Sequence, residues 1–202
     1  DPAMWSDPED PRKALELLVA DRLLERFHGR GTFIRRPGFG DSLFRFFRFR
    51  DADGQARVPE GKILSRRRAK PGRSIAAALR IEPGDPAIEM HRVRLHEGIP
   101  VLLEQIWLPL PRFEGFLSLD TDQIGNLLYP VYEAHCGQLV ARADETLTVE
   151  RATQMSARSL GIEPGAPIVA IDRIAFGYDD TPLEWRRSLG RADQFRYHTE
   201  IR

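Results

Sequence analysis

Two arginines separated by one residue, Arg92 and Arg94, are the side chains in this 202-residue chain whose types and spacing most clearly indicate chemistry. They lie in a strand-like run, and residues two apart in a strand point to the same face. Met90, Val93 and Leu95 alternate with them, so we expect one polar face. Two neighbouring guanidinium groups repel unless they share an anion or carboxylates. The pair predicts an anion-binding pocket under a loop, or alternatively a solvated ion pair on an exposed face.

The elements that position this pair occur twice. Leu79–Pro86 recurs as Leu160–Pro167, and each copy is followed by an apolar strand with an arginine, a turn and a second strand. Helical segments are predicted before each copy, at Ser74–Leu79 and Val149–Leu160. Two units of helix, Pro-Gly turn and hairpin predict one α+β domain whose halves share an antiparallel sheet.

A shorter module is predicted at the N-terminus. Leu15, Leu18 and Val19 recur with helical spacing, and Leu24–Ile34 has the pattern of two short strands around a turn that contains two glycines. Residues 22–50 are rich in arginine and contain two acids. A helix followed by a hairpin with a basic tip is typical of a winged DNA-binding module, although an ordinary αββ connection would give the same pattern.

Composition excludes several classes of protein. The chain has 30 basic and 30 acidic residues and one cysteine, Cys136, so an internal disulfide and a zinc site built on several cysteines are excluded. The five histidines show no metal-ligand spacing, and no cofactor is predicted. The chain has no apolar run long enough for a membrane helix and no signal-peptide pattern. We therefore expect a soluble cytoplasmic protein that has no membrane partner.

Two resemblances to known families follow from specific motifs. Arg12-Lys13-Ala14-Leu15 with Leu23–Phe33 resembles the end of a GntR-type winged helix-turn-helix, whereas residues 1–11 do not match the helices that precede it in that family. Residues 43–202 resemble the UTRA domain, the effector-binding module of the HutC-like GntR branch, through Pro83–Pro86, Leu103–Pro109 and Arg191–Tyr197. The resemblance implies part of a winged helix-turn-helix at 1–36, a linker at 37–42 and a UTRA domain at 43–202. It also implies a chorismate-lyase-like antiparallel sheet with flanking helices.

The resemblance implies a homodimeric, DNA-binding transcriptional regulator, usually a repressor, that a small anionic metabolite releases from its operator. By position, the implied effector contacts are Arg92, Arg94, Glu104, Tyr129, Glu184 and Tyr197. The implied operator contacts are Arg12, Lys13, His28, Gly29, Arg30 and Thr32. Leu127 stands where the family motif has a serine, and this departure weakens the case for a sugar phosphate.

Two alternatives remain open from the sequence. A stand-alone sensor domain without DNA binding fits if no complete recognition helix exists. A lyase that acts on an aromatic diacid fits the implied fold, with Arg92, Arg94 and Glu104 holding a carboxylate and moving a proton. No nucleophile and base pair supports catalysis, because His135 and Cys136 are adjacent and point in different directions. We therefore predict that the protein is not an enzyme.

Overall fold

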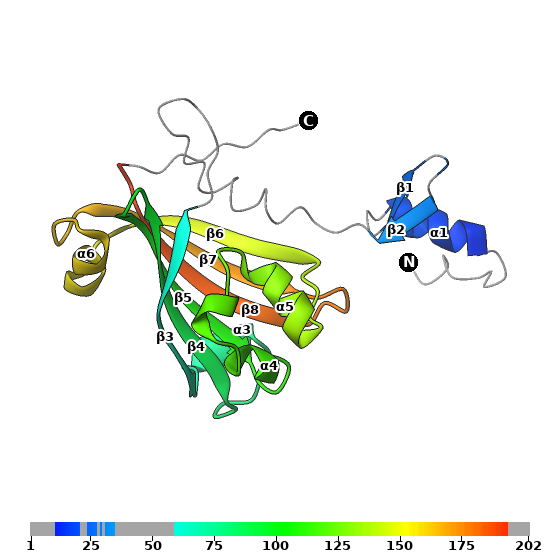
Figure 1. Ribbon diagram of the computed structural model, residues 1–202, viewed down its shortest axis with the longest axis horizontal. Coiled ribbons are helices and arrows are strands. Elements are labelled where there is room, and N and C mark those ends of the chain that lie inside the picture. Colours follow the sequence, from blue (N-terminus) through cyan, green and yellow to red (C-terminus); the bar gives the residue numbers. More distant parts are fainter. Residues whose placement is uncertain (1–10, 21–23, 28, 30, 35–58, 194–202) are drawn as a thin grey trace. The chain divides into compact units, whose positions relative to one another are not determined.

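The computed structural model describes residues 11–20, 24–27, 29, 31–34 and 59–193 (Figure 1). The chain divides into two compact units, residues 1–37 and 38–202. The linker predicted at 37–42 lies outside the described residues.

The first unit contains the predicted helix and hairpin. Helix α1 spans Pro11–Ala20 and begins with proline, whose fixed φ suits the first helical position. Strands β1 (Leu24–Phe27) and β2 (Gly31–Ile34) pair antiparallel. Gly29 and Gly31 have φ angles of 73° and 109°, which only glycine adopts readily. The predicted helix and hairpin are confirmed for this part of the chain.

The second unit is built on a six-stranded antiparallel sheet with the order β3-β4-β5-β8-β7-β6. The strands are β3 (Glu60–Ala69), β4 (Ala87–His96), β5 (Ile99–Pro109), β6 (Arg142–Arg151), β7 (Pro167–Phe176) and β8 (Pro182–Arg191). The central pair, β5 and β8, joins the two copies of the repeat. The predicted α+β class and shared sheet are confirmed.

Helices cover both faces of this sheet. Helices α4 (Glu114–Leu117) and α5 (Leu128–Cys136) pack with the main core, to which β4 and β5 contribute Ile88, Met90, Ile106 and Leu108. We call this face of the sheet the α5 face. A short 3-10 helix, Thr121–Gln123, lies between α4 and α5 in the chain. Helices α3 (Arg73–Ala78) and α6 (Gln154–Leu160) belong to the opposite face, where Leu79 packs with Trp107 and Leu160 packs with Ile168.

The helical prediction for Val149–Leu160 is wrong in its first part. Val149 and its two successors end strand β6, where Val149 pairs with Val169 and Arg151 with Pro167. The helix begins only at Gln154, because the Thr153 hydroxyl accepts a hydrogen bond from the Ser156 amide at 3.2 Å and caps it. The alternating β-branched residues of 146–149 favour a strand over a helix.

Trp107, His135 and Cys136 all lie in described elements of the second unit. Trp107 is buried on the face opposite the arginines, so it packs in the core and does not line their site. His135 and Cys136 end α5, and Gly137 caps it with a φ of 63°. In the described part of the chain, no helix has the length and apolar character needed to cross a membrane.

Candidate functional site

Arg92 and Arg94 are buried on the α5 face, with 1% of each residue exposed. Met90 lies on the same face, so the expected separation of polar from apolar positions is wrong: the arginines continue the apolar core face, and Val93 points to the other side. A solvated ion pair is therefore excluded. Arginines this deep require acceptors, because a buried and unpaired charge is strongly unfavourable.

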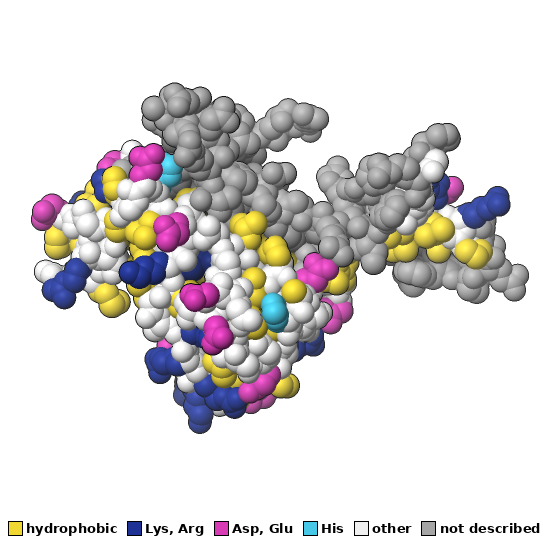
Figure 2. Space-filling model, viewed as in Figure 1, with side chains coloured by type: hydrophobic (Ala, Val, Ile, Leu, Met, Phe, Trp, Pro, Cys, Tyr) yellow, Lys and Arg dark blue, Asp and Glu magenta, His cyan; other side chains and the backbone are white. Residues whose placement is uncertain are grey.

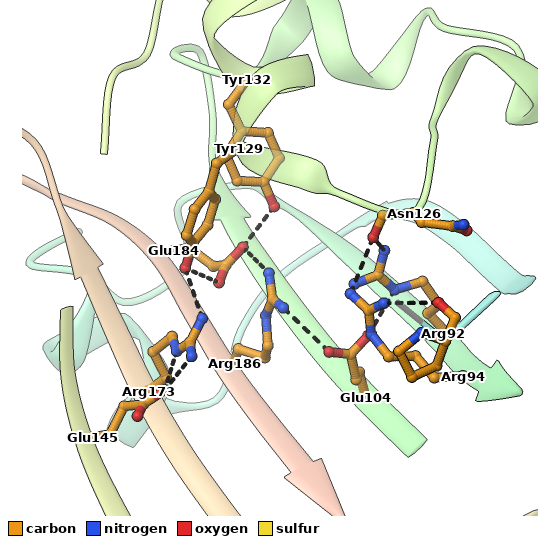
Figure 3. Close-up of polar contacts among 11 residues, drawn as sticks. Arg92, Arg94, Glu104, Asn126, Tyr129, Tyr132, Glu145, Arg173, Glu184 and Arg186 are labelled. Atoms are coloured by element: carbon orange, nitrogen blue, oxygen red, sulfur yellow. Dashed lines mark hydrogen bonds and ion pairs between the residues drawn. The ribbon is translucent and has the colours of Figure 1, made fainter. Parts of the chain in front are cut away.

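Glu104, which pairs in register with Arg92, supplies the shared carboxylate. Its Oε2 accepts from Arg92 Nε at 2.6 Å and from Arg94 Nε at 3.2 Å, and its Oε1 accepts from Arg186 Nη1 at 3.1 Å (Figure 3). Burial alone would raise the pKa of Glu104, but the three guanidinium groups outweigh it and hold this pKa well below the ordinary value. Burial and the neighbouring arginines lower the pKa of Arg94 to about 10, so it stays charged at neutral pH.

Glu184 forms a second carboxylate centre on the same face. Its Oε2 accepts from the Tyr132 hydroxyl at 2.6 Å and from Arg186 Nη2 at 2.7 Å, and its Oε1 accepts from the Tyr129 hydroxyl at 3.4 Å. Burial and the adjacent Glu184 carboxylate raise the pKa of Tyr132 well above its ordinary value, so Tyr132 remains a donor. Arg186 therefore bridges Glu104 and Glu184.

The network continues to strand β6. Arg173 Nη1 donates to the Tyr129 hydroxyl at 3.1 Å, and its guanidinium also pairs with the Glu145 carboxylate. Burial raises the pKa of Glu145 although Arg173 opposes this shift. Figure 3 shows these side chains as one line of alternating charge across β4, β5, β8, β7 and β6.

Asn126 holds the loop before α5 against the paired arginines. Its main-chain oxygen accepts from Arg94 Nη2 at 3.0 Å and from Arg92 Nη1 at 3.4 Å. Its side-chain Oδ1 accepts from the Gly61 amide at 2.8 Å, and Arg94 Nη1 donates to the Pro59 carbonyl at 3.3 Å. This loop covers the arginines on the α5 face.

Two guanidinium atoms in the cluster have no partner among the described residues. Arg92 Nη2 and Arg186 Nε are buried and make no hydrogen bond within that part of the chain. The cluster contains more cations than anions: the arginines are Arg92, Arg94, Arg173 and Arg186, and the carboxylates are Glu104, Glu145 and Glu184. An acceptor with negative charge satisfies both deficits, so the arrangement is suited to binding an anion.

The structure brings together most of the predicted effector contacts. Arg92, Arg94, Glu104, Tyr129 and Glu184 all lie in the cluster, and Tyr197 lies outside the described residues. Leu127, in place of the family serine, precedes α5 as its N-cap and provides no side-chain hydrogen bond.

Sequence reasoning missed Tyr132, Asn126, Glu145, Arg173 and Arg186. A signal for Arg186 existed, because Glu184 and Arg186 lie two apart on a strand, as Arg92 and Arg94 do. Arg173 occupies the repeat position of Arg92 and was detectable in the same way.

Of the predicted operator contacts, Arg12 and Lys13 are exposed on α1, and Gly29 and Thr32 are exposed at the hairpin. His28 and Arg30 lie outside the described residues. In the view of Figure 2, basic and acidic side chains are interspersed over the surface of the second unit. The described residues contain no group of histidine, cysteine and acidic side chains able to hold a metal ion.

Comparison with known proteins identifies the family. The UTRA domain model matches residues 40–196. The HTH-type transcriptional repressor NagR of Bacillus subtilis is 28% identical over 187 residues, which are 92% of this chain and 76% of that protein. The HTH-type transcriptional repressor PhnF of Mycolicibacterium smegmatis is 28% identical over 190 residues, 94% of this chain and 76% of that protein.

Solved structures of transcriptional regulators are also similar to this chain. The ligand-binding domain of a GntR-family regulator from Bordetella bronchiseptica superposes with a TM-score of 0.70 at 30% identity, over 78% of this chain and 96% of that one. The structure of PhnF from Mycobacterium smegmatis has the same fold, with a TM-score of 0.68 at 24% identity over 95% and 83% of the two chains. These relatives are regulators and not enzymes. The chain therefore belongs to the UTRA-domain family of GntR-type transcriptional regulators.

Proposed function

We propose that this regulator is a homodimeric repressor whose operator affinity is set by a small anionic metabolite bound at Arg92 and Arg94. A ligand that prefers the DNA-free arrangement lowers operator affinity by its difference in binding free energy between the two arrangements. The N-terminal unit supplies the DNA contacts and the UTRA domain supplies the effector site.

The observation that carries the effector site is the buried, unpartnered Nη2 of Arg92, together with the excess of guanidinium over carboxylate groups among the described residues. Arg92 and Arg94 both donate to the Asn126 carbonyl, which brings the two guanidinium groups together, and an anion that accepts from Arg92 Nη2 gains a charge-assisted hydrogen bond. Glu184, Tyr129 and Tyr132 lie further along the face and offer polar contacts for the uncharged part of a ligand.

An anion should raise the melting temperature of the wild-type protein, and the increase should be lost in Arg92→Met. The panel is sulfate, phosphate, a sugar phosphate and a carboxylate without phosphate such as urocanate. A ligand at one hundred times its Kd adds about 2.7 kcal/mol, which raises the melting temperature by about 5–10 °C in a domain of this size.

Arg187→Met is the matched control, because Arg187 lies next to Arg186 on the opposite face and pairs with Asp172 at 2.7 Å. Arg92→Lys, which keeps the charge but not the fork of donors, tests the site should Arg92→Met fail to fold. An anion response that survives in both Arg92 variants would contradict this assignment.

The N-terminal contacts make a separate prediction. Arg12 and Lys13 are exposed, and we assign them to DNA phosphates. Arg12→Ala or Lys13→Ala should each weaken binding to duplex DNA at all sequences and reduce the slope of log K against log salt by about one. Glu16→Ala, on the same helix, should not reduce that slope. Unchanged slopes in the two basic variants, measured by fluorescence anisotropy, would remove them from the DNA interface.

A further inference from the structure

The buried cluster on the α5 face carries one net positive charge among the described residues. Its charged members are the guanidinium groups of Arg92, Arg94, Arg173 and Arg186 and the carboxylates of Glu104, Glu145 and Glu184. The tyrosines of the cluster stay neutral, because burial raises the pKa of both Tyr129 and Tyr132. A ligand with one negative charge therefore neutralises the cluster, whereas a dianion leaves a net negative charge in a region where unbalanced charge is unfavourable.

The N-terminus of α5 is poor in the donors that a phosphate group uses. It borders the paired arginines, because Asn126, whose carbonyl accepts from Arg92, lies two residues before the helix. Phosphates bind helix N-termini mainly through main-chain amides. Here the N-cap Leu127 makes no side-chain hydrogen bond, and Pro130, the third residue of α5, has no amide hydrogen to donate. A carboxylate has fewer acceptor oxygens than a phosphate monoester, so it suits this helix end better.

A second pair of atoms on the same face is incompletely bonded. Arg186 Nη2 donates to Glu184 Oε2 at 2.7 Å, so these two groups are in contact (Figure 3). Arg186 Nε is buried and donates to no acceptor in the described part of the chain. Glu184 is fully buried, and from the same residues its Oε1 accepts only the Tyr129 hydroxyl, at 3.4 Å. A donor and an acceptor are therefore open beside one ion pair.

A ligand hydroxyl group matches both atoms, because it donates one hydrogen and accepts through its oxygen lone pairs. An ammonium group donates to Glu184 but cannot accept from Arg186, and a methylene group does neither. An ammonium group also cancels the negative charge of the ligand and leaves the positive excess of the cluster in place. The pair of atoms therefore favours a hydroxyl over an amine.

We infer that the effector is a monocarboxylate that carries a hydroxyl group. Its carboxylate accepts from Arg92 Nη2, and its hydroxyl accepts from Arg186 Nε and donates to Glu184 Oε1. This inference rests on the proposed function and adds the chemical class of the effector, since the proposed function requires only an anion at Arg92 and Arg94.

Matched probes separate the charge of the ligand from its hydroxyl groups. Gluconate has a single negative charge and a hydroxyl on every carbon after the carboxylate. Hexanoate keeps the charge without hydroxyls, glucose 6-phosphate keeps hydroxyls but is close to a dianion at about pH 7.5, and sorbitol is uncharged. Isothermal titration calorimetry of the full chain should give gluconate a Kd at least about tenfold lower than that of hexanoate or glucose 6-phosphate, because a lost hydrogen bond to a charged group weakens binding by about that factor. Sorbitol should not bind.

Glu184→Gln should shift this preference. The substitution removes the charged acceptor of the hydroxyl and makes the cluster more positive, so the affinity for gluconate relative to glucose 6-phosphate should fall by about tenfold or more. Glu150→Gln is the matched control, because Glu150 pairs with Arg187 on the opposite face and the same charge is lost outside the cluster. Should Glu184→Gln fail to fold, the ranking of the probes on the wild-type protein still tests the inference.

The outcomes separate this inference from the proposed function. Glucose 6-phosphate or inorganic phosphate that binds as tightly as gluconate, with binding lost in Arg92→Met, would overturn the carboxylate class and leave the anion site standing. Hexanoate that binds as tightly as gluconate would overturn the role of the hydroxyl. Absence of binding by every anion, or binding that persists in Arg92→Met, would overturn the effector site of the proposed function as well.

Discussion

Glu104→Ala should destabilise the protein by about 3–5 kcal/mol, one of the two largest losses we expect from a single substitution, because it leaves buried arginines without their shared acceptor. Arg92 and Arg94 both donate to Oε2 of this carboxylate, and Arg186 donates to Oε1. Urea denaturation followed by circular dichroism measures the loss. Glu114→Ala is the matched control: its ion pair with Arg68 is solvent-exposed and should contribute less than about 1 kcal/mol. Equal losses in the two variants would show that the cluster does not depend on Glu104.

The same carboxylate sets a pH dependence. The pKa of Glu104 is lower in the folded protein than in the unfolded chain. Its contribution to stability is therefore fully present above the unfolded pKa of about 4.3 and decreases as the pH falls toward the folded value. The stability difference between wild type and Glu104→Gln should shrink as the pH is lowered from about 6 to about 3. A difference that stays constant over this range would contradict the assignment.

Phe116→Ala should cost about 3–5 kcal/mol through the loss of buried contacts and the cavity that remains. The Phe116 ring is fully buried and meets the Tyr132 ring edge-on, with centroids 5.4 Å apart. Tyr132 in turn donates to Glu184, so the truncation also loosens the support of this carboxylate. Thermal unfolding should show a decrease in melting temperature of about 10 °C or more.

The control for this cavity is Leu64→Ala, which removes a side chain of similar character from the exposed surface of β3. Its cost should stay below about 1 kcal/mol, because little buried area is lost. A small effect of Phe116→Ala would mean that α4 contributes little to the core over the α5 face.

The two copies of the repeat were predicted well from the sequence, because local turn residues mark the boundaries of their helices and strands. Leu79–Pro86 and Leu160–Pro167 carry turn residues that fix where each helix ends and each strand begins. The segment 149–151 was mispredicted because its apolar spacing fits a helix over a short window, whereas pairing with β7 makes it a strand. Pairing between residues 20 apart in the sequence, as between Val149 and Val169, is not visible in a local pattern.

The candidate site was predicted in part for a similar physical reason. Two arginines on one strand indicated an anion site, because neighbouring guanidinium groups repel unless they share an anion or a carboxylate. Burial was not predictable, since Met90 and the arginines share a face that is covered by segments distant in the sequence, α4, α5 and the loop at Asn126. The bridge from Arg186 to Glu104 joins residues 82 apart, and strand order alone brings them together.

The contacts of Asn126 have a consequence for cooperativity. The side-chain oxygen of Asn126 accepts from the Gly61 amide at the start of β3, and its main-chain oxygen accepts from Arg92 and Arg94. Arg94 also donates to the carbonyl of Pro59, the residue directly before β3. We therefore expect the loop before α5, the first residues of β3 and the paired guanidinium groups to open together in hydrogen exchange. In the proposed function, an anion that draws either arginine away from these carbonyl oxygens would weaken the contacts that hold Pro59 next to the first residues of β3.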